Sequence, residues 1–381
     1  MTSRERLLKV IDGKIPDCVP VSPDISNMVP VKMTGKPFWD IYLYQDPPQW
    51  LAYINAAKYF NFDALMDGYV YVPFEELGEI DHEWEEVIIF KDEEKICTQQ
   101  KKETANGVEW SAKIMVYPRD NPPSHCKPSI IGMAEKPTSW EPVVGKKEWP
   151  KGAELIKFAK EEMGQQGLVG IFCGMSSFIH TEDDVYAFAD DPDSFYKYRD
   201  EYLEHIKVRL EHLLSLPQES RPDFICTGYS GTLVLQTVET FRGLGLPVVQ
   251  YVTKRCKEAG MPTHIHSCGP EKELIKICYN ETDLTVIDPL EIPHMGDCIL
   301  KDMKELYGDK LILKGNLHTT NVMLFGSVED VKAAAKQAID DAASGGKFIL
   351  STGDQCGRDT PHENLFAMIE VARTYGKYTE E

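Results

Sequence analysis

The stretch LILKGNLHTTNVMLFGSVEDVKAAAKQAIDDAASGGKFILST, residues 311–352, holds two short apolar runs separated by a helical pattern. The runs 311–315 and 347–352 are rich in Leu, Ile and Phe, which is typical of strands covered on both faces of a parallel sheet. Apolar residues repeat at three- to four-residue spacing over 328–344, and Ser327 can cap the start of that helix. The stretch therefore predicts one strand–helix–strand unit.

The same alternation continues through the chain. Eight short apolar runs predict strands at 18–22, 62–68, 167–173, 223–228, 262–267, 284–288, 311–315 and 347–352. Eight strands that alternate with helices favour a (β/α)8 TIM barrel, with a doubly wound sheet as the competing architecture. We expect a single α/β barrel domain over residues 1–381, with an N-terminal helical extension.

One segment, residues 73–150, interrupts this alternation after the second strand. Within it, 84–90, 94–99 and 108–116 read as short antiparallel strands, and a proline-rich stretch follows. Long loops at the carboxyl ends of barrel strands usually carry function. The segment is therefore interpreted as a β-containing insertion that serves as a lid or a partner-docking surface.

The overall composition is that of a globular protein, and its charge is strongly acidic. The formal net charge is −20, from 41 Lys and Arg and 61 Asp and Glu. Such a chain repels nucleic acid and anionic membrane surfaces, and no apolar run approaches the ~20 residues that span a bilayer. The charged start carries no signal-peptide pattern, so we expect a cytoplasmic protein whose ten cysteines are reduced thiols or metal ligands.

Three soft metal ligands are expected at the barrel mouth. His266 and Cys268 follow the fifth strand and share one face of an extended chain, and Cys356 follows the eighth strand. One imidazole and two thiolates suit Zn²⁺, and three protein ligands leave a coordination position open, as in catalytic zinc sites. The alternative is three unrelated buried side chains.

Other polar residues near strand ends are weaker candidates. His264 is interpreted as a hydrogen-bonded core histidine rather than a fourth ligand. Glu291 and Asp288 follow the sixth strand and either could approach the ion, but acidic residues at strand ends are common and often cap the next helix. The candidates for substrate binding are Tyr229, Met175, Asn316, His318 and Glu291, with Ser176, Ser230, Asp63, Asp67 and Asp288 as further strand-end residues.

Four motifs make the chain resemble the uroporphyrinogen decarboxylase superfamily. They are Arg4-Glu5-Arg6-Leu7-Leu8 with Gly13-Lys14-Ile15-Pro16-Asp17-Cys18-Val19-Pro20-Val21, His266-Ser267-Cys268-Gly269, Gly315-Asn316, and Thr360-Pro361-His362-Glu363-Asn364 after Cys356. Within the superfamily, the chain looks like the branch of zinc-dependent, corrinoid-dependent methyltransferases. It departs from that branch mainly in the length of the 73–150 insertion. It lacks the arginine cluster that the decarboxylases carry after the first strand, since no Arg lies between Arg6 and Arg119.

The resemblance implies methyl transfer between the cobalt of a separate corrinoid (methylcobamide) protein and a small substrate. No Asp-x-His-x-x-Gly corrinoid-binding motif occurs in this chain, so the cofactor is expected on the partner. His266, Cys268 and Cys356 would hold Zn²⁺, and the substrate is either a thiol acceptor or an O-methyl donor such as an aryl methyl ether or an alcohol. The alternatives are a metal-free lyase of the decarboxylase type and a non-catalytic binding protein in which zinc staples two loops.

Overall fold

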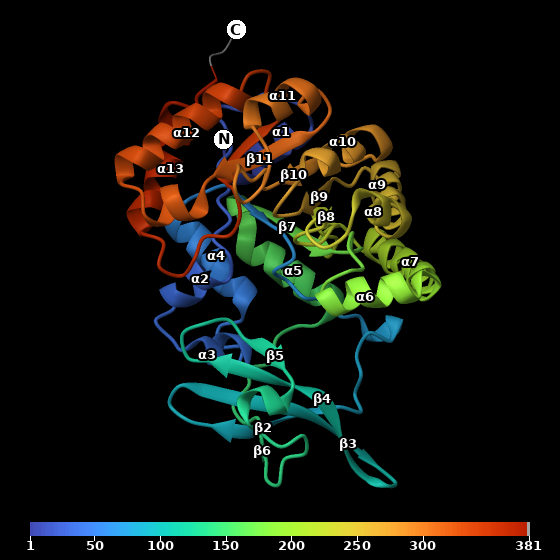
Figure 1. The fold of residues 1–381 in the computed structure, drawn as a ribbon. Helices are drawn as coiled ribbons and strands as arrows, with labels where there is room; N and C mark the ends of the chain where they lie inside the picture. The colour runs from blue at the N-terminus through green and yellow to red at the C-terminus, as the bar shows by residue number, and fades with distance from the viewer. Residues whose placement is uncertain (379–381) are drawn as a thin grey trace.

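The computed structural model describes residues 1–378, and their centre is a curled parallel sheet surrounded by helices (Figure 1). The strands are β1 (Ala64–Met66), β7 (Gly167–Phe172), β8 (Phe224–Cys226), β9 (Thr263–His266), β10 (Val286–Asp288), β11 (Ile312–Leu317) and β12 (Phe348–Thr352). They pair in parallel in that order, with register pairs such as Ala64 with Gly167 and Gly315 with Leu350. The predicted α/β class is confirmed.

Residues 20–22 close the barrel between β12 and β1. Val21 forms a parallel bridge with Leu350, and the Ser22 amide donates to the Leu350 carbonyl at 2.8 Å. On the other side, the Asp63 amide donates to the Val21 carbonyl at 2.8 Å. The predicted first strand, 18–22, is thus shortened to a bridge, in keeping with Pro20 within it, because proline has no amide hydrogen to donate to a sheet.

The chain also has thirteen α-helices among residues 1–378, and most of them cover the outside of the barrel sheet. Their bounds are α1 (Ser3–Ile11), α2 (Met28–Met33), α3 (Phe38–Tyr42), α4 (Gln49–Phe60), α5 (Gly152–Met163), α6 (Glu182–Asp190), α7 (Pro192–Ser215), α8 (Val238–Leu244), α9 (Leu246–Glu258), α10 (Lys272–Glu281), α11 (Leu300–Tyr307), α12 (Val328–Ala342) and α13 (His362–Thr374). Helix α12 begins where the sequence predicts, since the Ser327 side chain accepts from the Asp330 amide. No helix within residues 1–378 is both long and apolar enough to cross a membrane.

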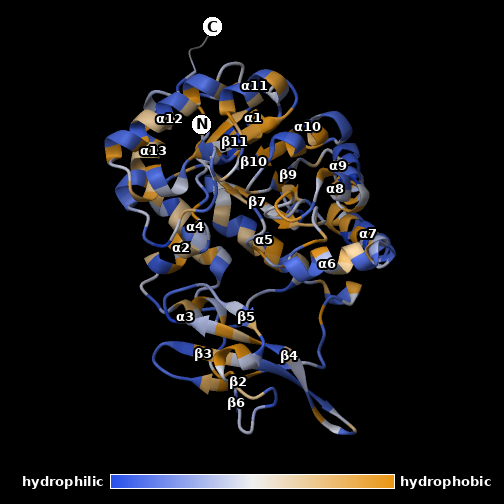
Figure 2. Cartoon of the chain, viewed as in Figure 1, coloured by the Kyte–Doolittle hydropathy of each residue, from blue (hydrophilic) through white to orange (hydrophobic). Residues whose placement is uncertain are grey.

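Helix α1 plugs the amino-terminal end of the barrel. Its Leu7 and Val10 pack with inward-facing strand residues, among them Leu65, Leu168 and Phe224. A larger apolar layer lies between the outside of the strands and the surrounding helices. Figure 2 shows this pattern, with apolar strands inside and hydrophilic outer faces on the helices.

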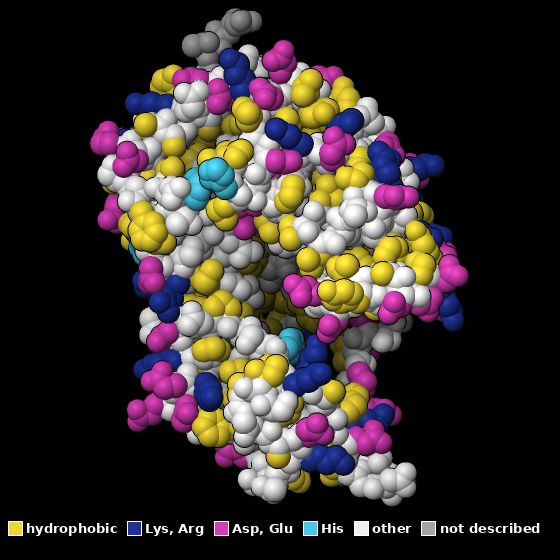
Figure 3. Space-filling view, viewed as in Figure 1, with side chains coloured by type: hydrophobic (Ala, Val, Ile, Leu, Met, Phe, Trp, Pro, Cys, Tyr) yellow, Lys and Arg dark blue, Asp and Glu magenta, His cyan; other side chains and the backbone are white. Residues whose placement is uncertain are grey.

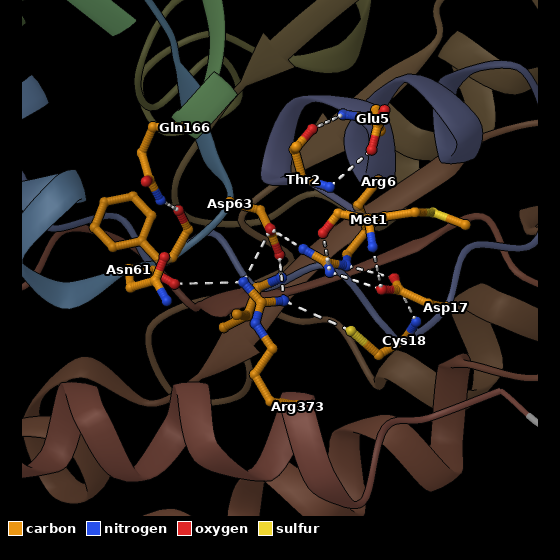
Figure 4. Close-up of polar contacts among 12 residues, drawn as sticks. Met1, Thr2, Glu5, Arg6, Asp17, Cys18, Asn61, Asp63, Gln166 and Arg373 are labelled. Carbon is orange, nitrogen blue, oxygen red and sulfur yellow. Dashed lines mark hydrogen bonds and ion pairs between the residues drawn. The ribbon is translucent and has the colours of Figure 1, made fainter. Parts of the chain in front are cut away.

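A buried carboxylate, Asp63, ties both ends of the chain to this end of the barrel (Figure 4). The Asp63 side chain is fully buried and lies 2.6 Å from Arg6 Nη1 of α1. Arg373 of α13 donates to both of its oxygens, at 2.7 and 2.9 Å, and the Val21 amide donates to one of them at 2.8 Å. Asp63 therefore holds the barrel closed and lies at the end remote from the carboxyl ends of the strands.

The insertion forms a second sheet, and Figure 3 shows the surface hollowed between this sheet and the barrel. Its antiparallel strands are β2 (Glu85–Lys91), β3 (Lys95–Thr104), β4 (Gly107–Pro118), β5 (Ser124–Cys126) and β6 (Glu141–Pro142), in the order β5-β4-β3-β2-β6. The predicted strands 84–90, 94–99 and 108–116 correspond to β2, β3 and β4, although β3 runs further than expected. Its role as a lid or docking surface stays a prediction.

Candidate metal centre at the barrel mouth

A cavity of about 370 Å³ lies at the carboxyl ends of the first five barrel strands. Its wall includes the polar side chains of Asp24, Asp67, Tyr69, Tyr229, Ser230 and His266. Within residues 1–378, no Arg or Lys lines this cavity. Its chemistry is therefore set by carboxylates, hydroxyls and imidazoles.

Three side chains at the edge of this cavity place ligand atoms close together. One atom each of His266, Cys268 and Asp354 lies within 4.8 Å of the other two. His266 ends β9, Cys268 lies two residues beyond it, and Asp354 lies two residues beyond β12. His266 Nε2 is 3.4 Å from Asp354 Oδ1, and Cys268 Sγ is 2.8 Å from the Ser230 hydroxyl. The loops after β9 and β12 thus meet at the barrel mouth, although β10 and β11 separate these two strands in the sheet.

This donor set fits a metal ion. His266 Nε2 is buried and has no hydrogen-bond partner among residues 1–378, while its other ring nitrogen, Nδ1, faces Asp288 at 3.2 Å. A carboxylate on Nδ1 fixes the tautomer that leaves Nε2 as an electron-pair donor, which is the usual arrangement around a metal-bound histidine. Imidazole, thiolate and carboxylate are all ligands of Zn²⁺.

Asp288 is the centre of a buried charge cluster beneath these ligands. One oxygen lies 3.0 Å from His264 Nε2 and 3.2 Å from His266 Nδ1, and the other contacts the Lys314 ammonium. Burial opposes ionisation of Asp288, but Lys314 and the two imidazoles hold its pKa well below the usual range. Burial likewise opposes the charge on Lys314, but Asp288 raises the pKa of this lysine. His264, 1% exposed, also lies 3.3 Å from Asp67, in keeping with a polar core histidine.

Cys356 lies in a different environment. Its side chain is fully buried and belongs to the apolar layer between strands and helices. Its amide donates to the Asp24 carbonyl at 2.8 Å, and its carbonyl accepts from the Ser26 hydroxyl at 2.9 Å. Burial and the nearby Asp24 carboxylate raise the pKa of the Cys356 thiol to about 12. Among residues 1–378, it joins no group of three ligands, and its role as a metal ligand stays a prediction.

The predicted substrate-binding residues are spread over the strand ends. Tyr229 lines the cavity, and its ring centroid lies 4.4 Å from that of His180. Glu291 accepts from the Gly269 amide, and burial raises the pKa of this carboxyl. Glu291 thereby holds the loop that follows Cys268.

The other three contact backbone or neighbouring helices. Asn316 donates to the Leu290 carbonyl at 2.9 Å. His318 Nδ1 accepts hydrogen bonds from the amides of residues 320 and 321, at the start of the short helix Thr319–Leu324. Met175 is half-buried outside the cavity wall, and its amide donates to the Tyr202 hydroxyl. Their roles in substrate binding stay predictions.

Residues 224–375 match the family model described as uroporphyrinogen decarboxylase (URO-D). This part, which is less than half of the chain, is similar to the URO-D family. The resemblance predicted from sequence is confirmed. The matched segment contains His266, Cys268, Asp354 and Cys356, together with Asp288.

A curated relative matches part of the chain. The methylcobamide:CoM methyltransferase MtbA of Methanosarcina mazei is 29% identical over 139 residues, which are 36% of this chain and 37% of that protein. The matched segment thus spans little more than a third of the relative.

A solved structure matches nearly all of the chain. The structure of a methyltransferase from Methanosarcina mazei covers 98% of this chain, and 99% of its own length is matched, with a TM-score of 0.62 at 18% identity. At this identity the likeness shows a shared fold.

Sequence reasoning missed residues that surround the candidate metal ligands His266 and Cys268. Lys314 was overlooked, although one charge inside the apolar run of 311–315 is a signal that it faces a buried partner. Asp24 was also overlooked; it lines the cavity, and burial raises its pKa to about 6. Asp354 was not among the candidates predicted from the sequence.

Proposed function

We propose that the chain is a zinc-dependent methyltransferase that moves a methyl group between the cobalt of a separate corrinoid protein and a small substrate. The substrate is a thiol acceptor or an O-methyl donor such as an aryl methyl ether or an alcohol. The observation that carries the proposal is the convergence of His266, Cys268 and the loop after β12 beside a 370 Å³ cavity. The relative MtbA, a methylcobamide:CoM methyltransferase, supports the same reaction class.

Each part of the site has a defined task in this proposal. His266 and Cys268 hold the ion, with a third ligand from the loop after β12, for which the sequence predicts Cys356. Zinc, when bound, favours the thiolate form of a thiol or polarises an ether oxygen. Asp288 orients His266 through its Nδ1. The cavity walls hold the substrate so that donor, methyl group and acceptor lie in line.

Decarboxylation of a polycarboxylate is not favoured by the cavity. Asp24 and Asp67 line it, and no basic side chain of the described residues does. A substrate with several carboxylates would meet like charge there without an arginine to pair with it. Arg6, the arginine nearest the first strand in sequence, pairs with Asp17 and Asp63 at the opposite end of the barrel.

The test is a methyl-transfer assay with both substrate classes. The chain is mixed with a corrinoid protein in its Co(I) state plus anisole-type ethers or alcohols, or in its methyl-Co(III) state plus small thiols, and the cobalt absorption is followed. We expect transfer in one arm, with loss of activity on zinc chelation and in Cys268→Ser. No transfer in either arm with zinc-loaded protein would refute the proposal. Transfer that survives complete chelation would favour a metal-free enzyme.

A further inference from the structure

We propose that the third protein ligand of the metal is Asp354 rather than Cys356, so that the site is built from one imidazole, one thiolate and one carboxylate. This inference rests on the proposed function only for the presence of a metal. It concerns which side chains of this chain bind the ion.

The distances favour Asp354. Ligand bonds of about 2.0–2.3 Å in tetrahedral geometry separate neighbouring donor atoms by roughly 3.3–3.8 Å. His266 Nε2 and Asp354 Oδ1 are 3.4 Å apart, and Cys268 Sγ completes a set within 4.8 Å. One ion can therefore contact all three atoms after only small side-chain movements.

Two further observations point to a ligand at this place. His266 Nε2 is buried, faces Asp354, and has no hydrogen-bond partner in the part of the chain that is described. Asp354 adopts φ of 141°, a backbone conformation that residues other than glycine rarely take. Such conformations are concentrated at active sites and ligand clamps, where the surroundings compensate for the strain. Here the strained residue is the one that presents its carboxylate to His266.

Cys356 has a structural task that competes with metal binding. Its backbone joins Ser26 and Asp24, which follow the barrel-closing segment, and its side chain is fully buried in the apolar layer. Buried cysteines that pack among apolar residues usually act as small hydrophobic residues. Cys356 thus anchors the loop that carries Asp354.

A carboxylate in place of a second thiolate changes the character of the ion. Oxygen is a harder donor than sulfur, so the bound metal keeps more of its Lewis acidity and more affinity for oxygen ligands. The ligand set therefore favours the O-methyl donor arm of the transfer assay.

The experiment replaces zinc by Co²⁺ in the full-length protein and measures the thiolate-to-cobalt charge-transfer absorption and the metal content. We compare Cys356→Ala with Cys268→Ser and Asp354→Asn, and with Cys278→Ala as a control for removing a fully buried cysteine elsewhere. We expect Cys356→Ala and Cys278→Ala to keep one metal per chain and the wild-type band, and Cys268→Ser to lose the band. Asp354→Asn should weaken metal binding by at least about tenfold, since even outer-shell partners are worth 10–100-fold.

Two results would overturn the inference. One is a band that falls by half in Cys356→Ala while Cys278→Ala is unchanged, because this identifies a second thiolate. The other is unchanged metal affinity in both Asp354→Asn and Asp354→Ala. Circular dichroism of each variant separates ligand loss from misfolding, and Cys356→Ser serves if the alanine variant does not fold. These readouts need no turnover, so a protein that shows this spectrum but no methyl transfer would refute the proposed function and leave the ligand assignment intact.

Discussion

The buried pair of Lys314 and Asp288 gives the sharpest stability test of the site. The Lys314 side chain is 4% exposed and that of Asp288 is 1% exposed. We predict that Lys314→Met, which keeps the length and apolar stem of the side chain, destabilises the metal-free protein. The reason is that Asp288 remains buried without its principal counter-charge.

The magnitude follows from the burial. Removing one partner of a buried pair costs about 3–5 kcal/mol. Two imidazoles remain within 3.0 and 3.2 Å of Asp288 and can share its charge, so we expect the lower end, about 3 kcal/mol. An unfolding entropy of about 2.1 cal/mol/K per residue, applied to 381 residues, gives about 0.8 kcal/mol/K, hence a fall in Tm of about 4 °C.

The assay is denaturant unfolding in the presence of a chelator, with Asp288→Asn and the double variant as the other corners of a double-mutant cycle. Removing both charges should restore more than half of the stability lost in Lys314→Met, because no uncompensated carboxylate remains. A Lys314→Met variant within 1 kcal/mol of wild type, or a double variant less stable than the single one, would refute the reasoning.

Three further predictions concern other parts of the chain. Asp63→Asn leaves Arg6 and Arg373 without their shared carboxylate and should lower the free energy of unfolding by about 3 kcal/mol in denaturant titrations. Burial lowers the pKa of Lys304 to about 8, so between pH 8 and 10 the unfolded chain binds more protons than the folded one, and stability should rise with pH relative to Lys304→Met. An unchanged gap between the two proteins at pH 8 and 10 would contradict this. Ser327→Ala removes the cap of α12 and should cost about 1 kcal/mol by the same titration, with Ser327→Asn as the control that keeps the cap.

The barrel itself was accessible from sequence because its elements have strong local signals. The apolar runs of β7, β11 and β12 are typical of buried strands, so their secondary structure could be predicted directly. Helix α12 carries its own cap and a regular apolar stripe. The shortened first strand was harder to foresee, because its pairing depends on partners at 63 and 350 that are remote in the chain.

The metal site was accessible only in part, for a reason of backbone geometry. His266 and Cys268 lie in one short motif at a strand end, so alternation of side chains places them on one face. After β12 that rule fails, because the positive φ of Asp354 changes the direction of the chain between residues 352 and 356. Sequence alone therefore identifies the loop but does not indicate whether residue 354 or residue 356 faces His266.

The seam of the barrel joins segments from near the two ends of the chain, since Val21 pairs with Leu350. Residues 20–22 join β12 to β1. Asp24 follows two residues later and lines the cavity, and its carbonyl accepts a hydrogen bond from the Cys356 amide. Because so few backbone bonds close the seam, its amides should exchange with solvent sooner than those of the central strands. A molecule bound against Asp24 would reduce local opening of the seam and slow this exchange. Deuterium uptake at the seam therefore offers a way to detect ligand binding in the cavity before any substrate has been identified.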